Sequence, residues 1–258
     1  MNHIDSLFNK KGNNILSVYF TAGYPNLNDT IPAIKSLVEN GADMIEVGIP
    51  FSDPMADGVV IQQSSSKALK NGMTLPLLLH QLADIRKDIP NTPLILMGYL
   101  NPIMQFGIEK FFSECKSIGI DGFIIPDLPF ADYLRDFKPL CDKYGIHMIM
   151  LITPATEDER IRLIDANCSG FIYMVSSAST TGTKEHFGEE QVKYFKHIDS
   201  LGLKNPRLIG FGISNPETMQ ASCHYSCGGI IGSLFIKCLR DCPSINAATQ
   251  KLIATLGR

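Results

Sequence analysis

The chain has 258 residues, a length that fits one barrel-sized domain and is short for two full α/β domains. Hydrophobic residues make up 45% and charged residues 19%, a composition that can bury a large core. The formal net charge of −3 gives no electrostatic reason to expect binding to nucleic acid or to an anionic membrane surface. Residues 1–14 lack the apolar core of a secretory signal, and no apolar run approaches membrane-spanning length, so we expect a cytoplasmic protein.

The predicted strands are short apolar runs rich in β-branched and aromatic residues. They lie at 15–21, 44–47, 94–98, 122–125, 147–151, 171–175, 207–210 and 228–231. Amphipathic segments between these runs predict helices at 29–39, 64–69, 75–88, 108–117, 131–144, 157–166 and 191–201, one starting at 216, and two more at 233–239 and 244–256.

Eight strands that alternate with helices over this length predict a (β/α)8 barrel, formed as a single domain of residues 1–258. A doubly wound open sheet is the main structural alternative. Such a sheet usually has fewer strands, and no G-x-G-x-x-G motif follows the first predicted strand here.

The cysteines raise the question of a metal site. There are seven, an odd number in a chain without an export signal, so we expect reduced thiols. Cys223 and Cys227 form one C-x3-C pair, and Cys238 and Cys242 form another. These spacings also suit one face of a helix, and four-cysteine zinc sites more often use C-x2-C pairs. We therefore expect no bound metal, an expectation that stoichiometric zinc in the purified protein would overturn.

The stretch 44–62 carries three carboxylates in an unusual setting. Glu46 lies inside an apolar strand, where burial opposes ionisation and raises the pKa of a carboxyl group. Asp53 and Asp57 follow in a loop rich in proline and glycine, where catalytic groups tend to lie. A loop whose aspartates bind their own backbone would explain Asp53 or Asp57 singly, but it leaves Glu46 unexplained.

Glycines after the seventh and eighth strands predict a phosphate site. Residues 210–214 read GFGIS, and Gly232-Ser233 follows the last strand at the start of a helix. Glycines let backbone N–H groups approach a ligand, and a helix N-terminus favours an anion. Barrel enzymes commonly bind a substrate phosphate at this place. Ordinary turn glycines with a capping serine would explain either motif alone. The loop at 176–190 is long for a connection of this kind and predicts a lid or binding loop.

The whole chain resembles the α subunit of tryptophan synthase, in order from end to end. The resemblance is carried by YFTAGYP at 19–25, IEVGIPFSDPMADGVVIQ at 45–62, PDLP at 126–129, GFGIS at 210–214 and GS at 232–233. It implies a lyase that cleaves indole-3-glycerol phosphate to indole and glyceraldehyde 3-phosphate. It also implies no cofactor in this chain, and a β subunit that contains pyridoxal phosphate and joins this chain in an α2β2 tetramer.

Particular roles follow from the resemblance. Glu46 matches the family's mobile acid and base, and Asp57 matches its fixed carboxylate. Thr181 matches a threonine involved in loop closure. The family's interface with its partner subunit maps onto Asp53, Pro54 and the helix after residues 100–102. The phosphate clamp maps onto Gly182, Gly212, Gly232 and Ser233. The indole pocket maps onto Tyr19, Ile61, Met97, Ile124, Tyr173 and Phe211.

The sequence departs from the family pattern at two places. The family usually has Gly-Pro after the residue matching Asp57, whereas this chain has Gly58-Val59. The loop after the sixth strand usually reads S-x-x-G-V-T-G, and residues 176–182 lack the first of these glycines. A lost glycine at positive φ would reshape or slow loop closure.

Two other functions remain open on the sequence. One is a non-catalytic barrel that binds and activates a β subunit, an idea that the altered loop suggests. The other is a phosphate-binding barrel that isomerises or epimerises sugar phosphates. That chemistry needs a different acid–base pair or a metal, and no metal-ligand spacing occurs at the predicted strand ends.

Overall fold

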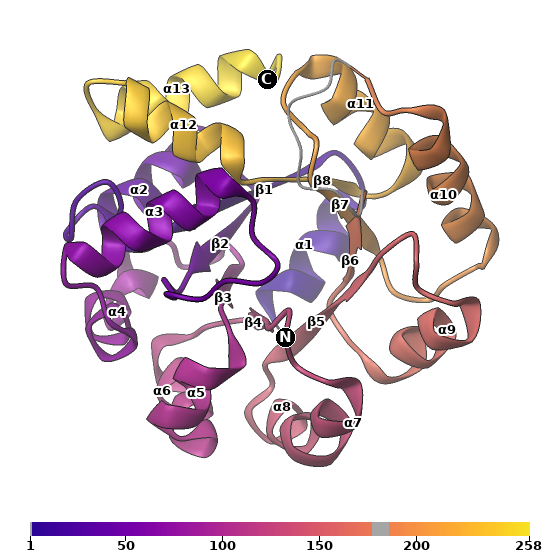
Figure 1. Cartoon of the computed structure of the whole chain (residues 1–258), viewed down its shortest axis with the longest axis horizontal. Helices are drawn as coiled ribbons and strands as arrows, with labels where there is room; N and C mark the ends of the chain where they lie inside the picture. The colour runs from indigo at the N-terminus through magenta and orange to yellow at the C-terminus, as the bar shows by residue number, and fades with distance from the viewer. Residues whose placement is uncertain (1, 177–185) are drawn as a thin grey trace.

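The computed structural model describes residues 2–176 and 186–258. Within them, eight parallel strands pair in sequence order, and the last pairs with the first to close a barrel (Figure 1). The strands are β1 (Ile15–Thr21), β2 (Met44–Gly48), β3 (Leu94–Met97), β4 (Gly122–Ile124), β5 (His147–Ile152), β6 (Ile172–Val175), β7 (Arg207–Gly210) and β8 (Gly228–Ile231). The predicted (β/α)8 barrel is confirmed, and the open sheet is wrong.

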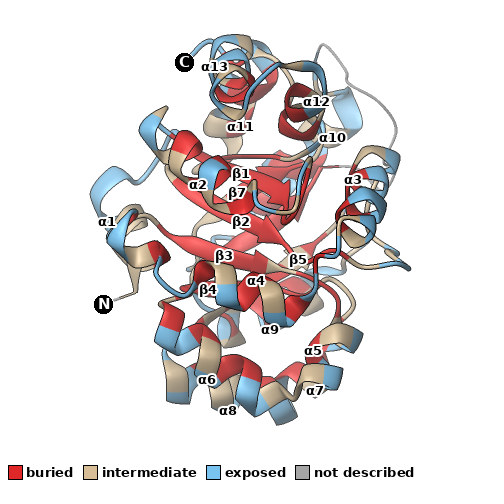
Figure 2. Ribbon diagram, turned by 90° about the vertical axis from the view of Figure 1, so that its left-hand side faces the viewer, coloured by how far each residue is buried: buried red, intermediate tan, exposed pale blue. Residues whose placement is uncertain are grey.

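Helices surround the barrel and cover the outer faces of its strands. Figure 2 shows buried strands at the centre and exposed surface on the outer sides of the helices. The helices are α1 (His3–Lys11), α2 (Thr30–Glu39), α3 (Val59–Lys70), α4 (Leu75–Leu82), α5 (Leu100–Phe106), α6 (Ile108–Ile118), α7 (Phe130–Asp132), α8 (Lys138–Tyr144), α9 (Asp158–Asn167), α10 (Glu189–Ser200), α11 (Pro216–Tyr225), α12 (Ser233–Asp241) and α13 (Ile245–Thr255). In the described part of the chain, no helix combines the length and apolar character needed to cross a membrane.

The alternation of side chains along each strand separates two cores. On β1, Leu16, Val18 and Phe20 belong to the larger core, between the strands and the helices. Ile15 belongs to the smaller core inside the barrel. Since successive side chains of a strand point to opposite faces, Ser17 and Tyr19 also face the interior. The same rule places Glu46 inside the barrel, two residues after the inner-core residue Met44.

Helix α1 closes the N-terminal end of the barrel and was not predicted. Asn2 caps it by accepting a hydrogen bond from the backbone N–H of Ile4. Ile4 is fully buried in the inner core, and the ring of Phe8 lies 5.9 Å from that of Phe171. In the view of Figure 1, α1 appears at the centre of the ring of strands and lies on the far side of the barrel. With this end closed, the opposite end is left to hold a ligand.

Four helical regions differ from the sequence prediction. The helix predicted at 75–88 ends at Leu82 as α4, and a separate 3-10 turn follows at Ile85–Lys87. Helix α3 begins at Val59, five residues before the predicted start at residue 64. Helix α5 lies in a segment for which no helix bounds were predicted. The helix predicted at 131–144 contains a wider, π-helical turn at Tyr133–Phe137 between α7 and α8. Such turns arise from backbone geometry that hydrophobic periodicity does not report.

Asp121 links α1 to the N-terminal end of the barrel. It is 5% exposed, and it accepts hydrogen bonds from the backbone N–H groups of His3 and Leu94. The Arg86 guanidinium also donates to Asp121 and to the backbone carbonyl of Gly119. One carboxylate therefore links α1, β3 and the segment before β4.

We expect Asp121→Ala to lower the free energy of unfolding by about 3 kcal/mol, because it strips a buried ion pair of one partner. Urea denaturation followed by circular dichroism measures this. Asp88→Ala is the matched control, since Asp88 pairs with Lys35 at the surface, with the two side chains 38% and 44% exposed. Its cost should stay below about 1 kcal/mol. Equal losses in the two variants would contradict the role of Asp121.

Candidate active site

Glu46 is a carboxyl group buried inside the barrel. It is 0% exposed, and its Oε1 accepts a hydrogen bond of 2.6 Å from the Ser17 hydroxyl. Its Oε2 has no hydrogen-bond partner among the residues that the structure describes. Burial raises the pKa of Glu46 to about 7, and the hydrogen bond from Ser17 opposes the rise. Near neutral pH, Glu46 can therefore both hold and release a proton.

Asp57 lies in the loop between β2 and α3, beyond the carboxyl end of β2. The Tyr99 hydroxyl donates to Asp57 Oδ2 at 3.0 Å and accepts from the backbone N–H of Ala56 at 3.0 Å. The Tyr99 ring stacks on Phe51, with centroids 5.2 Å apart. Burial raises the pKa of Asp57, and the Tyr99 hydrogen bond opposes that rise. Tyr99 thus fixes both the loop and its carboxyl group.

Two buried tyrosines connect the carboxyl groups electrostatically. Burial raises the pKa of Tyr19, and the charges of Asp57 and Glu46 raise it further. Burial also raises the pKa of Tyr173, with additional contributions from Glu46 and Asp57. Both carboxyl groups therefore act on both phenols, so the four side chains form one group. The structure brings together residues from β1, β2, β6 and the β2–α3 loop.

Glycines make room for these tyrosines. A Cβ atom on Gly48 would collide with the Tyr19 hydroxyl, and one on Gly210 would collide with the Tyr173 hydroxyl. Each phenol therefore lies directly against the backbone of another strand. Since any side chain at either glycine would displace a ring, the glycines fix the positions of Tyr19 and Tyr173.

The turn after β7 has an unusual backbone. Phe211 has a φ of 69° and Gly212 a φ of 76°, so two successive residues are left-handed. Phe211 is not a glycine, and residues held in this region often occur at functional sites. The Ser176 hydroxyl donates to the Phe211 carbonyl oxygen at 2.8 Å. The ring of Phe211 meets that of Tyr173 edge to face, at 6.3 Å.

The predicted phosphate residues lie at the carboxyl ends of the last two strands. Gly212 follows β7, Gly232 follows β8, and Ser233 is the first residue of α12. A Cβ atom on Gly232 would come within 3.2 Å of Tyr19 Cδ1 and 3.6 Å of Ile61 Cδ1. The start of α12 therefore lies beside two predicted pocket residues. Two other predicted residues, Gly182 and Thr181, lie outside the described residues.

The remaining pocket residues line the same end of the barrel. In the strand register, Gly48 of β2 pairs with Met97 of β3, and Met97 pairs with Ile124 of β4. Ile124 belongs to the inner core, and Met97 packs against that core. Met97 and Ile124 thus lie at the carboxyl ends of β3 and β4, the end of the barrel that also carries Phe211 after β7.

The third carboxylate of the stretch is set apart from the other two. Asp53 is exposed, and its Oδ2 accepts a hydrogen bond from Ser52 at 2.5 Å. Pro54 is half-buried beside it, and Met55 is 86% exposed. Asp53 and Pro54 thus lie on the outer side of the loop that carries Asp57.

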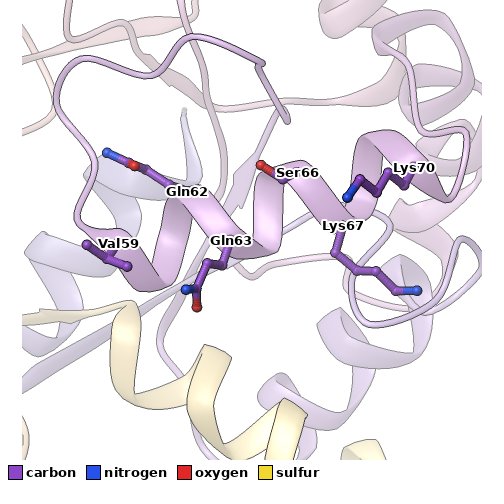
Figure 3. A pocket seen from close by; sticks show the side chains of 6 residues that line it. All are labelled: Val59, Gln62, Gln63, Ser66, Lys67 and Lys70. Carbon is purple, nitrogen blue, oxygen red and sulfur yellow. The ribbon is translucent and has the colours of Figure 1, made fainter.

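Val59 is accommodated as the first residue of α3. Proline is favoured at this position, where the backbone N–H has no partner within the helix, but other residues serve as well. The Val59 side chain is 66% exposed and borders a shallow depression along α3 (Figure 3). The other residues lining the depression are Gln62, Gln63, Ser66, Lys67 and Lys70. The departure from the family pattern therefore leaves the helix start in place.

All seven cysteines are free thiols, including the four considered as zinc ligands. In the two described ranges, no three histidine, cysteine, aspartate or glutamate residues are grouped to hold a metal ion. Three histidines have acidic partners that sequence spacing did not reveal. His3 contacts Asp121, His147 contacts Asp5, and His197 contacts Asp158.

Sequence reasoning missed Ser17 and the role of Tyr99. Ser17 is a polar residue in the middle of the apolar strand ILSVYFT, and that position was the available signal. Tyr99 lies two residues after the end of β3, and its bond to Asp57 spans 42 positions of sequence. Neither partner can be identified without the fold.

Comparisons with known proteins agree on one family. Residues 6–257 match the family model described as tryptophan synthase alpha chain. The tryptophan synthase alpha chain of Parabacteroides distasonis is 56% identical over 99% of both chains. That of Bacteroides thetaiotaomicron is 53% identical over 98% of both. The crystal structure of tryptophan synthase subunit alpha from Legionella pneumophila is 33% identical, with a TM-score of 0.87 over 99% of this chain and 97% of that chain.

Proposed function

The chain belongs to the tryptophan synthase alpha chain family, lyases that act on indole-3-glycerol phosphate, and we propose that Glu46 and Asp57 carry its reaction. The reaction is a retro-aldol cleavage of indole-3-glycerol phosphate to indole and glyceraldehyde 3-phosphate. The observation that carries the assignment is a pair of carboxyl groups with raised pKa values, Glu46 fully buried and Asp57 half-buried, which both act on Tyr19 and Tyr173. Groups tuned in this way are typical of acid–base catalysis.

The two carboxyl groups have different tasks in this mechanism. Asp57 accepts the indole N–H and stabilises the positive charge that develops on the ring as C3 is protonated. Glu46 gives a proton to C3 and takes the proton of the glycerol hydroxyl as the carbon–carbon bond breaks. Glu46 must therefore begin protonated while Asp57 is ionised. The pKa of about 7 at Glu46 supports its part.

The substrate phosphate and ring would be held by the surrounding residues. Gly212, Gly232 and Ser233 supply backbone N–H groups and a hydroxyl at the start of α12, where the helix dipole favours an anion. Tyr173 and Phe211 offer aromatic faces to the indole ring. Tyr19, Ile61, Met97 and Ile124 would complete the pocket. Gly182 and Thr181 retain their proposed roles in phosphate binding and loop closure.

Indole release from indole-3-glycerol phosphate by the purified chain tests this function. We expect indole and glyceraldehyde 3-phosphate in equal amounts, with faster release when a β subunit is added. The absence of indole under both conditions would contradict the proposal and favour a non-catalytic activating module.

We also propose that this chain joins a β subunit, which contains the pyridoxal phosphate, in a cytoplasmic α2β2 tetramer. Exposed apolar side chains near the active site support such an interface. Met55 and Val59 are 86% and 66% exposed beside Asp53 and Pro54, and Met104 on α5 is 56% exposed. The free state of all seven cysteines fits a reducing compartment. No cofactor is assigned to this chain itself.

Met104→Asp is expected to weaken binding to the β subunit about tenfold or more, because it places a charge in an apolar contact. Calorimetric titration measures the affinity. Leu163→Asp is the matched control: Leu163 is 46% exposed on α9, which Figure 1 shows well apart from α5 around the barrel. Equal affinities for the Met104 variant and the unmodified chain would place the interface elsewhere.

A further inference from the structure

Ser17 places a hydroxyl group deep inside the barrel. It is 0% exposed and lies between Ile15 and Tyr19 on the inward face of β1. Burying a hydroxyl group costs free energy unless the group is hydrogen-bonded, so Ser17 needs a partner inside the apolar core. The partner is Glu46, whose Oε1 accepts the Ser17 hydrogen bond at 2.6 Å. Ser17, which is outside the proposed catalytic pair, is therefore hydrogen-bonded directly to Glu46, the residue proposed to act as both acid and base.

The strand register gives the direction in which Glu46 points. Glu46 is level with Tyr19 on β1, whereas Ser17 is level with Met44. The carboxyl group of Glu46 thus reaches back by two positions, toward the N-terminal ends of the strands. Asp57 lies beyond the opposite ends, in the loop after β2. In this orientation, Glu46 is turned away from the side of the barrel that would hold the substrate.

We propose that Ser17 is a positioning residue, whose hydroxyl holds the Glu46 carboxyl group in the orientation that points back toward the N-terminal ends of the strands. This inference rests on the proposed role of Glu46 as acid and base. A serine hydroxyl can donate to a carboxylate and accept from a carboxylic acid. The bond is therefore available before and after each proton transfer, so Ser17 can receive Glu46 in either protonation state. Glu46 Oε2, which has no partner among the described residues, leaves the carboxyl group held by one oxygen.

The same bond affects the acidity of Glu46. Burial raises its pKa and the Ser17 hydrogen bond lowers it, giving a value of about 7. Among the described residues, the other titratable groups that face Glu46 are the phenols of Tyr19 on β1 and Tyr173 on β6, and Asp57 acts on both of them. Without the Ser17 hydroxyl, burial is no longer opposed by that bond, so the pKa of Glu46 rises.

The test is a carbon-13 NMR titration of protein labelled at the glutamate side-chain carboxyl, in the unmodified chain and in Ser17→Ala. The Glu46 signal is identified by its loss in Glu46→Gln. We expect Ser17→Ala to raise the pKa of Glu46 by about one unit, the size expected for a hydrogen bond to a charged group. The limb of the pH–rate profile that Glu46 controls should move to higher pH by the same amount. The value of kcat should fall, with KM unchanged.

Two further variants complete the test. Ser17→Thr keeps the hydroxyl and should keep the pKa of Glu46 near that of the unmodified chain. Ser222→Ala is the matched control, because Ser222 is also 0% exposed but donates to the Met219 carbonyl on α11. It should leave the pKa of Glu46 and the pH–rate profile unchanged.

An unchanged pKa of Glu46 in Ser17→Ala, or an equal rise in Ser17→Thr, would overturn the inference. If Ser17→Ala does not fold, Ser17→Cys takes its place: a thiol is a weaker donor than a hydroxyl, so the pKa of Glu46 should still rise, and an unchanged value would overturn the inference. The NMR titration does not depend on turnover. Normal indole release by Glu46→Gln would refute the proposed catalytic role of Glu46. That result is therefore distinguishable from a failure of the Ser17 inference, which the NMR titration reports.

Discussion

Glu46→Gln is expected to lower the rate of indole release about a hundredfold to ten-thousandfold, the range for losing a general acid–base group. Glutamine has nearly the same shape and can still bond to the Ser17 hydroxyl, so the barrel should fold normally. Steady-state measurement of indole formation tests the loss. The matched control is Glu39→Gln at the end of α2, which should retain full activity. Activity within twofold of the unmodified chain would remove Glu46 from the mechanism.

The same variant should be more stable than the unmodified chain above neutral pH. Glu46 has a pKa of about 7 in the folded protein and an ordinary value of 4.5, so between these values the folded state binds more protons than the unfolded state. Stability therefore falls as the pH rises through this window and stays low above it. Glutamine removes that cost, giving a gain of about 3 kcal/mol at pH 8 and almost none at pH 4. Urea denaturation at the two pH values measures both. A gain of equal size at pH 4 and pH 8 would contradict a raised pKa.

Asp57→Asn is the second variant with a large expected effect, a loss of about a hundredfold or more in kcat. Asparagine can accept both the indole N–H and the Tyr99 hydroxyl, but it lacks the negative charge that stabilises the protonated ring. The loss should therefore appear in kcat more than in KM. Measurement of both constants for indole release separates the two.

The control for Asp57→Asn is Asp84→Asn, an exposed aspartate whose side chain is 78% exposed and pairs with Lys87 at the surface. It should leave both constants unchanged. A rise in KM with normal kcat in Asp57→Asn would make Asp57 a binding residue without a role in the chemical step.

The strands could be predicted because they are buried on both faces, which produces continuous apolar runs. Glu46 stood out for the same reason, as a charge in such a run. Helix α1 was missed although Asn2, Ile4, Leu7 and Phe8 carry its cap and apolar spacing. Its position at the start of the chain, before any strand, gave no βα alternation to suggest it.

The parts that sequence did not reveal depend on contacts between distant residues. Ser17 and Glu46 are 29 positions apart, and Tyr99 and Asp57 are 42 positions apart. The direction in which the Glu46 side chain points depends on the closed barrel, because its partner Ser17 lies on the neighbouring strand β1. The left-handed backbone of Phe211 is similar, since aromatic residues have no local preference for it.

In the proposed mechanism, Asp57 binds the indole nitrogen while Glu46 faces C3 and the glycerol hydroxyl. A crystal structure of Asp57→Asn with intact indole-3-glycerol phosphate tests it most directly. We predict the indole N–H within hydrogen-bond distance of residue 57, the Glu46 carboxyl group turned away from Ser17 toward C3, and the phosphate on Gly232 and Ser233. A substrate bound in the reverse direction, with its phosphate beside residue 57, would contradict it.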